Sequence, residues 1–187
     1  MQLMADRPIL IVSGTNRPSS NTLRIARVIQ QHYQDHNLSA DFFDVTDLPR
    51  EVFEPTVYAS KPAPFVEIQN RVYHAAGLHL VLPEYNGSFP GILKYFIDLL
   101  KFPESFDRKP VAFVGLANGM FGALRAVEQL QMVFSYRNAH VYPDRVFIPA
   151  VRDKLDATGK VSDPAIVERL AKQAKGFAQF AGAVAAH

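Results

Sequence analysis

Residues 8–36 read PILIVSGTNRPSSNTLRIARVIQQHYQDH, which predicts a strand, a polar loop and a helix in direct succession. Pro8–Val12 is a continuous apolar run without alternation, as expected of a strand that is covered on both faces. The helix should extend from about Asn21 to His36, because apolar side chains line one stripe there: Leu23, Ala26, Ile29 and Tyr33. A strand that leads through a loop into an amphipathic helix is the building unit of a parallel sheet.

The same alternation continues along the rest of the chain. Further strands are predicted at Asp41–Val45, Leu78–Leu82 and Val111–Leu116, and the last strand within Val141–Ile148. Further helices are predicted at Phe65–Ala76, Gly91–Phe102, Gly122–Tyr136 and Pro164–Ala186. Because right-handed crossovers place helices on both faces of a parallel sheet, this order predicts an α/β three-layer sandwich with a five-stranded parallel sheet. Five strands fit a flavodoxin-like arrangement better than the longer two-half dinucleotide fold. The length predicts a single domain over residues 1–187.

Two segments depart from the plain alternation. Asp47–Pro64 is a long irregular connection with several prolines, and such connections are usually functional or mobile. In Gly91–Phe102 the charged residues Lys94, Asp98 and Lys101 are confined to one narrow stripe. A helix this apolar is expected to be buried on two sides. We interpret it as a subunit interface, although an intramolecular contact would give the same pattern.

The composition excludes several classes of function. The formal net charge is only +2 and no basic run occurs, so nucleic acid is not an expected partner. The absence of cysteine excludes thiolate metal sites and a cysteine nucleophile, and the six histidines show no metal-ligand spacing. Met1–Asp6 is too short and too polar for a signal peptide, and no apolar run reaches the ~18–20 residues of a membrane span. We therefore expect a cytoplasmic protein without a membrane segment or a metal site.

Three loops follow strands at the edge of the sheet where ligands bind in such folds. The first, Ser13–Thr22, leads into a helix N-terminus, whose free N–H groups and dipole favour an anion such as a phosphate monoester. It contains Arg17 and more hydroxyl and amide side chains than one helix cap needs, although an ordinary capped turn is the alternative. The loop lacks GxGxxG and the Walker pattern, which disfavours a nicotinamide-only dehydrogenase and a nucleoside triphosphatase.

The second and third loops are suited to a flat ring. Pro83–Gly91 reads PEYNGSFPG, so its backbone N–H groups near Asn86 and Gly87 could face the polar edge of a heterocycle, with Tyr85 over part of its face. A plain Asn-Gly turn is the alternative for this loop. Ala117–Ala123 contains two glycines, which permit positive φ or a close approach of the backbone to a ligand, although an ordinary glycine-rich strand-to-helix turn is the alternative.

Together these loops resemble the NADPH-dependent FMN reductase family, whose relatives include quinone, azo-dye and chromate reductases. Residues 82–94, LPEYNGSFPGILK, are similar to the family signature PEYNxSxPGxLK. The first loop is similar to the family's GSxRxxSxN, which it matches at Gly14, Arg17 and Ser20. The chain departs from the family pattern at Thr15 (usually serine), Thr22 (usually asparagine), Leu99 (usually tryptophan) and Phe121 (commonly glycine). The resemblance covers about residues 8–151.

The resemblance implies bound FMN, NADPH or NADH as the hydride donor, and a homodimer or homotetramer with sites near the subunit boundaries. It would place the FMN phosphate on Gly14, Thr15, Arg17, Ser20, Asn21 and Thr22. The ring would meet Pro83, Glu84, Tyr85, Asn86 and Gly87, with Asn118 and Gly119 near its pyrimidine side. Because hydride exchange needs no acidic or basic side chain at the reacting atom, no catalytic residue is expected.

The expected function is therefore an FMN-dependent NAD(P)H oxidoreductase that passes hydride to a small-molecule acceptor such as a quinone, free flavin, azo compound or metal oxyanion. A flavodoxin-type electron carrier is one alternative, although typical flavodoxins are strongly acidic and the sequence pI here is about 8.9. A non-catalytic FMN-binding protein is another. A serine hydrolase is disfavoured because no GxSxG elbow occurs.

Overall fold

The computed structural model describes residues 7–156 and 158–185, so the predicted lack of a signal peptide at Met1–Asp6 lies outside the described residues. The strands are β1 (Ile9–Ser13), β2 (Ala40–Asp44), β3 (Gly77–Pro83), β4 (Pro110–Leu116), β5 (His140–Val141) and β6 (Val146–Ile148). The helices are α1 (Asn21–Asp35), α2 (Ala63–His74), α3 (Gly91–Leu99), α4 (Leu124–Tyr136) and α5 (Pro164–Ala185). Short 3-10 turns form η2 (Val45–Asp47), η3 (Arg50–Phe53), η4 (Pro55–Tyr58) and η5 (Val151–Lys154).

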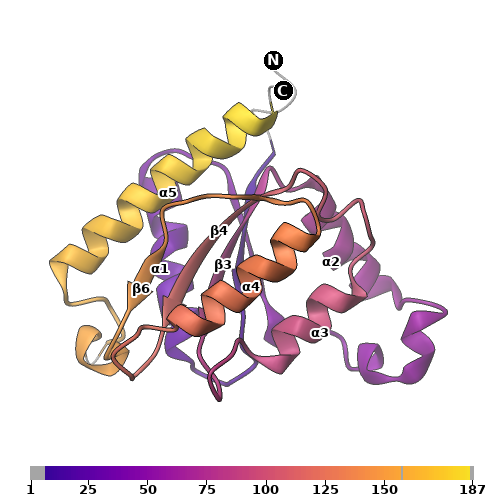
Figure 1. The fold of residues 1–187 in the computed structure, drawn as a ribbon, viewed down its shortest axis with the longest axis horizontal. Helices are drawn as coiled ribbons and strands as arrows, with labels where there is room; N and C mark the ends of the chain where they lie inside the picture. Colours follow the sequence, from indigo (N-terminus) through magenta and orange to yellow (C-terminus); the bar gives the residue numbers. More distant parts are fainter. Residues whose placement is uncertain (1–6, 157, 186–187) are drawn as a thin grey trace.

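The sheet is parallel throughout, with the order β2-β1-β3-β4-β5 and with β6 also paired to β4 (Figure 1). This is the flavodoxin-like order, in which the connections change direction between β1 and β3. The fold class predicted from the sequence is confirmed. In Figure 1 the chain enters β1 near the top, so the C-terminal ends of the strands lie toward the lower edge.

The last predicted strand, Val141–Ile148, is divided into two pieces. β5 pairs with the start of β4 and β6 with its end, so the two pieces occupy one position in the sheet. Pro143 lies in the gap and has no N–H to donate to a ladder. The side-chain amide of Gln173 on α5 bridges the gap, because its Nε2 donates to the carbonyls of Phe113 at 3.0 Å and Asp144 at 2.8 Å.

Side chains of the sheet alternate between two cores. In β1, Leu10 and Val12 belong to the core covered by α2, α3 and α4, whereas Ile9 and Ile11 belong to the core covered by α1 and α5 (Figure 1). This arrangement gives the expected three layers. The buried face of α1 differs slightly from the predicted stripe, because Leu23 is only half-buried while Thr22 and Ile25 are buried.

Helix α3 is buried on two sides, as expected, but both sides are covered within the chain. Its Leu93 and Phe96 pack in the core, while the Tyr95 ring stacks on Phe53 of η3 at 5.4 Å and its hydroxyl donates to the Val52 carbonyl. The connection that looked irregular in the sequence therefore forms three short turns that contact α3. The apolar pattern of α3 does not by itself require a second subunit.

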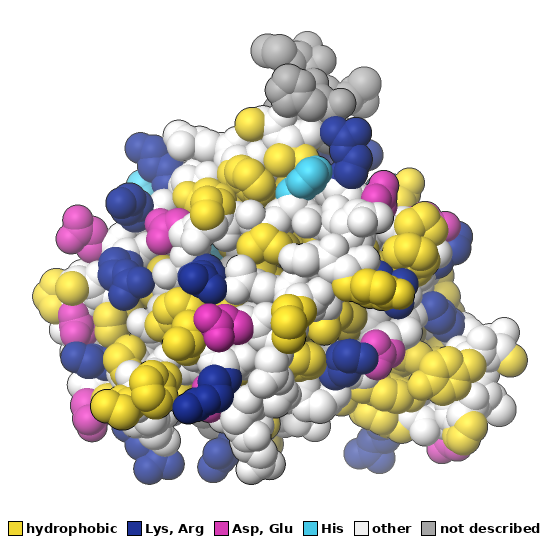
Figure 2. All heavy atoms as spheres, in the orientation of Figure 1, with side chains coloured by type: hydrophobic (Ala, Val, Ile, Leu, Met, Phe, Trp, Pro, Cys, Tyr) yellow, Lys and Arg dark blue, Asp and Glu magenta, His cyan; other side chains and the backbone are white. Residues whose placement is uncertain are grey.

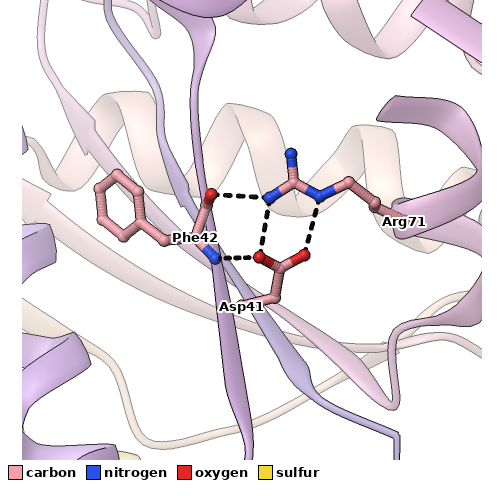
Figure 3. A network of polar contacts seen from close by, with 3 residues as sticks. All are labelled: Asp41, Phe42 and Arg71. Carbon is pink, nitrogen blue, oxygen red and sulfur yellow. Dashed lines mark hydrogen bonds and ion pairs between the residues drawn. The ribbon is translucent and has the colours of Figure 1, made fainter. Parts of the chain in front are cut away.

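An ion pair fastens α2 to the edge strand β2. The Arg71 guanidinium donates to both carboxylate oxygens of Asp41 at 2.8 Å and to the Phe42 carbonyl at 2.7 Å (Figure 3). Burial opposes ionisation of Asp41, but hydrogen bonds from Arg71 and from the Phe42 N–H outweigh this effect and hold the pKa of Asp41 below its usual range. Both side chains are about a third exposed, so the pair makes a modest contribution to stability.

A buried polar network crosses the second core. His79 of β3 is fully buried, with Nδ1 at 3.0 Å from the Tyr33 hydroxyl and Nε2 at 3.1 Å from Oε1 of Gln173. Burial raises the pKa of Tyr33 well above its usual range, so this hydroxyl stays protonated and donates to Nδ1. The neutral imidazole then carries its proton on Nε2 and donates to Gln173. Each polar group of this set has a partner, as buried polar groups require.

Candidate functional site

A cavity of about 670 Å³ lies at the C-terminal edge of the sheet, where the loops after β1, β3 and β4 meet. The first loop and the start of α1 contribute Arg17, Pro18, Ser19, Ser20, Asn21, Thr22 and Arg24. The other walls are Pro83, Glu84, Tyr85, Asn86, Gly87, Leu116, Ala117, Asn118, Gly119, Val151 and Arg152. The three loops that the sequence singled out thus line one cavity, as their positions after parallel strands predict.

The first loop presents backbone donors to this cavity. Ser20 is the N-cap of α1, and its hydroxyl accepts a hydrogen bond from the Leu23 N–H at 3.0 Å. No protein acceptor within the described residues takes the N–H groups of Asn21 and Thr22. Such free N–H groups at the positive end of a helix are suited to an anion. Ser19, at φ 53, turns the chain directly before the cap.

The second loop is a tight hairpin. Tyr85 and Ser88 exchange both backbone hydrogen bonds, at 2.8 and 3.0 Å, and the two residues between them have positive φ, 52° at Asn86 and 76° at Gly87. These values are typical of a type I′ turn, which strongly favours Asn-Gly. Gln129 of α4 fixes the turn, because it accepts a hydrogen bond from the Ser88 hydroxyl at 2.6 Å and donates to the Gly87 carbonyl at 3.1 Å.

Two side-chain contacts connect the second loop to its neighbours. The hydroxyls of Thr15 and Tyr85 share a hydrogen bond of 2.8 Å, which ties the first loop to the second. Glu84 lies 3.6 Å from a guanidinium nitrogen of Arg125 on α4. The Arg125 guanidinium also lies 5.0 Å from the centre of the Phe121 ring, in a cation–π contact. These contacts hold Glu84 and Tyr85 in place before any ligand binds.

The third loop is joined to the segment that follows β6. The Ala117 N–H donates to the Ile148 carbonyl at 3.1 Å, and the Val151 N–H donates to the Ala117 carbonyl at 3.1 Å. Gly122 has φ 56, and a Cβ there would lie 2.8 Å from the Ile148 nitrogen. A glycine is therefore needed at this position both for its backbone conformation and for space.

All the predicted site residues line the cavity except Gly14 and Thr15. A Cβ on Gly14 would lie 2.9 Å from a Leu93 methyl and 3.0 Å from the Val81 carbonyl, so this glycine permits close packing beneath the site. Thr15 is buried and supports Tyr85. Arg24 and Arg152, which were not among the predicted site residues, add positive charge to the cavity. Arg24 lies one turn into α1 and could have been found from the helical period, whereas no local signal connects Arg152 to the first loop.

The sequence of the chain matches a known protein family. A family model described as NADPH-dependent FMN reductase matches residues 8–153. The chain belongs to this family. The family resemblance, the oxidoreductase class and the cofactors FMN and NAD(P)H that the sequence predicted are confirmed by this match.

Individual relatives agree with the family. The chain is 29% identical over 173 residues to an NAD(P)H-dependent FMN reductase of Pseudomonas aeruginosa, a match that covers 90% of this chain and 91% of that protein. It is 29% identical over 116 residues to an FMN-dependent NADPH-azoreductase of Staphylococcus aureus, which covers 59% of this chain and 61% of that protein. The solved structure of FerB, a flavoenzyme NAD(P)H:acceptor oxidoreductase of Paracoccus denitrificans, shares the fold with a TM-score of 0.78 at 22% identity, over 94% of this chain and 97% of FerB.

Within residues 7–156 and 158–185, no helix combines the length and the apolar character needed to cross a membrane. Over the same residues, no group of three or more His, Cys, Asp or Glu side chains is placed to hold a metal ion. The cytoplasmic location stays a prediction.

Proposed function

We propose that FMN binds in the cavity at the C-terminal edge of the sheet and that the enzyme transfers hydride from NADPH or NADH through this flavin to a small-molecule acceptor. The observation that supports the proposal most strongly is the meeting of the three predicted loops around one cavity of about 670 Å³. A cavity of this volume lies in the range of small-molecule and cofactor sites.

The groups in the cavity fit the two ends of FMN. At one end, Arg17, the free N–H groups of Asn21 and Thr22, and the positive end of α1 form a donor set for a phosphate. At the other, the turn at Asn86 and Gly87 and the loop at Asn118 and Gly119 border open space: a Cβ on either glycine would have no neighbour within 4 Å. A flat ring can therefore approach both backbones closely.

Bound FMN supplies the hydride chemistry, and the residues of this chain bind and orient it. The Asn86 and Gly87 N–H groups, which donate to no protein group within the described residues, are available to the polar edge of the ring. Tyr85 is held by Thr15, and the turn is held by Gln129, so the ring would meet a preorganised wall. Glu84 is engaged with Arg125, which favours a positioning role for its carboxylate over that of a general base.

The acceptor is proposed by class: a quinone, a free flavin, an azo compound or a metal oxyanion. Phe121 stands where the family pattern that the sequence resembles commonly has glycine, and it is half exposed beside Arg125. We expect this ring to restrict the space above the flavin, so that small or planar acceptors react faster than bulky ones. Replacement of Phe121 by glycine should raise turnover of a bulky azo dye more than turnover of a small quinone.

The spectrum of the purified protein tests the proposal. Flavin absorption bands that copurify, or that appear with added FMN, and that bleach on anaerobic addition of NADPH are the expected result. A protein that takes up FMN but does not oxidise NADPH or NADH would instead be a carrier or a non-catalytic FMN-binding protein. A colourless protein that cannot bind added FMN would overturn the proposal altogether.

A homodimer or homotetramer is proposed as well, through the face formed by α3 and α4. Figure 2 shows hydrophobic side chains between charged ones across this face. Met132 and Tyr136 of α4 are 66% and 79% exposed, and they line a groove of about 370 Å³ together with Lys94 and Asp98 of α3. A second copy that buries these side chains would remove the largest apolar exposure on α4 from water.

Light scattering coupled to gel filtration tests this face. The wild-type protein should elute as a dimer or tetramer, and Met132→Glu combined with Tyr136→Glu should shift it toward the monomer. Tyr58→Glu is a matched control, because Tyr58 is 70% exposed on η4, outside this groove. A monomeric wild type at micromolar concentration would exclude the oligomer, and an unchanged double variant would exclude this face.

A further inference from the structure

The cavity carries more positive charge than the first loop alone provides. Arg17, Arg24 and Arg152 line it, and Glu84 is its sole acid among the described residues. Glu84 is already paired with Arg125, whereas the ion pairs found in the described part of the chain include none of the three lining arginines. The three guanidinium groups are therefore not neutralised by nearby carboxylates.

Arg17 and α1 together supply less positive charge than a fully ionised phosphate monoester carries. Its net charge near neutral pH is about −1.5 to −2. The N-terminus of a helix corresponds to about +0.5, and Arg17 adds one full charge. Together they supply about +1.5, so a shortfall of up to about half a charge remains for the dianion, and the other two arginines line the same cavity and could cover it.

Arg24 is engaged in a structural contact. Its Nη1 lies 3.4 Å from Oδ1 of Asn21, within the same helix. Its side chain also packs against the turn at Gly159, where a Cβ would lie 3.0 Å from Cδ and 3.1 Å from Nε of Arg24. These contacts hold Arg24 between α1 and the segment before α5, and they leave Arg152 as the better candidate.

Arg152 lies on a rigid part of the cavity wall. It belongs to η5, which begins after Ala150, a non-glycine residue with φ 47. Val151 is 3% exposed, and its N–H donates to the Ala117 carbonyl at 3.1 Å, so the backbone of η5 is fixed to the third loop. A left-handed alanine is uncommon, and such residues are concentrated at functional segments. Arg152 itself is exposed and has no acidic partner in the described residues.

We infer that Arg152 is the second arginine that binds the phosphate of FMN, together with Arg17, and that it makes the site selective for FMN over riboflavin. The inference rests on the proposed function, in which FMN occupies this cavity. A guanidinium suits this role because its planar set of N–H donors matches two oxygens of a phosphate. Arg152 contributes binding energy in this arrangement and takes no part in hydride transfer.

Flavin binding to the apoprotein tests the inference without turnover. The Kd values for FMN and for riboflavin are measured by quenching of flavin fluorescence for the wild type, Arg152→Gln, Arg152→Lys and the control Arg50→Gln. Arg50 is exposed on η3 and does not line the cavity. Arg152→Gln should raise the Kd for FMN by about 10- to 100-fold, as expected for the loss of a hydrogen bond to a charged group. The Kd for riboflavin should not change in any of these variants.

Lysine at position 152 should restore part of the affinity, because it keeps the charge but not the paired donors. The dependence of the FMN Kd on salt should be shallower in Arg152→Gln than in Arg152→Lys, since one charge contact is missing. Thermal melting checks that each variant is folded. If Arg152→Gln does not fold, the comparison of Arg152→Lys with the wild type still tests the paired contact.

Three results would overturn the inference. The first is an unchanged FMN Kd in Arg152→Gln, and the second is an equal loss of FMN and riboflavin. The third is a raised KM for NADPH with unchanged FMN binding, which would assign Arg152 to the 2′-phosphate of the nicotinamide cofactor. A wild-type apoprotein that binds no FMN would overturn the proposed function itself, which is a distinguishable outcome.

Discussion

Acidification from pH 7.5 to 5.0 should destabilise the protein through His79. This side chain is fully buried, and burial lowers its pKa from 6.5 to about 4, although the hydrogen bond to Gln173 opposes the shift. In the unfolded chain the same imidazole titrates near 6.5. Between these two values the unfolded chain binds a proton that the folded protein does not. The contribution of His79 to stability is therefore complete above pH 6.5 and is lost as the pH falls toward 4.

The magnitude follows from the two pKa values. At pH 5.0 the imidazole is almost fully protonated in the unfolded chain and about one-tenth protonated in the folded protein. This difference lowers the free energy of unfolding by about 2 kcal/mol relative to pH 7.5, and by about 3 kcal/mol well below pH 4. A loss of 2 kcal/mol is a large part of the stability of a typical domain.

Urea unfolding at the two pH values measures this loss for the wild type, His79→Gln and His36→Gln. Glutamine at position 79 can accept from Tyr33 and donate to Gln173, but it does not titrate. The wild type should lose about 2 kcal/mol more than His79→Gln between pH 7.5 and 5.0. His36 is exposed, so His36→Gln should keep the wild-type response. If the wild type and His79→Gln respond equally to pH, the argument that His79 is neutral because it is buried is wrong.

Three further experiments test the loops of the site through stability. Ser20→Ala removes the side-chain cap of α1 and should lower the free energy of unfolding by about 1 kcal/mol, measured by urea denaturation. In a double-mutant cycle on the free energy of unfolding, Tyr85→Phe and Thr15→Val should be coupled by about 0.5–1.5 kcal/mol, because each removes the same 2.8 Å hydrogen bond. Additive effects of the two substitutions would show that this hydrogen bond does not stabilise the protein. Gly122→Ala should lower the melting temperature by several degrees, because Gly122 has φ 56 and an added Cβ would lie 2.8 Å from a backbone nitrogen in β6. Gly119→Ala is the control: an added Cβ there has no neighbour within 4 Å, so this variant should melt like the wild type.

The parts of the fold that the sequence predicted are those whose signal is local. The strand at Pro8–Val12 and the helix after it were identified from an uninterrupted apolar run and a 3.6-residue period, and both lie in the structure within a few residues. The end of α3 was placed too late, at Phe102. Pro103 was the available signal, because the residue before a proline disfavours helical conformation. Leu99 ends the helix, and its carbonyl accepts a hydrogen bond from Lys61 instead.

The features that were missed depend on residues far apart in the chain. Val141–Ile148 was predicted to contain one strand because most of its residues suit a strand, and Pro143 alone indicated a break. The bridging amide comes from Gln173, about thirty residues later, so no window around the strand contains it. The residues that cover the second apolar side of α3 could not be identified from the sequence either. They are Val52 and Phe53, which belong to a connection without a regular hydrophobic period.

The candidate site also has parts that sequence order predicts and parts that depend on distant residues. Loops after parallel strands must share one edge of the sheet, so the sequence order was sufficient to bring the first, second and third loops together. A motif does not distinguish residues that face a ligand from residues that support them. Gly14 and Thr15, which the family resemblance places at the phosphate, do not line the cavity; Gly14 packs on Leu93 and Thr15 holds Tyr85. The charge of the phosphate, by contrast, indicates a binding residue that lies outside the motif. A dianion carries about two charges, Arg17 and the start of α1 supply about one and a half, and any further cation comes from a segment that the motif does not contain. If Arg152 supplies it, then the segment after β6 carries part of the cofactor specificity.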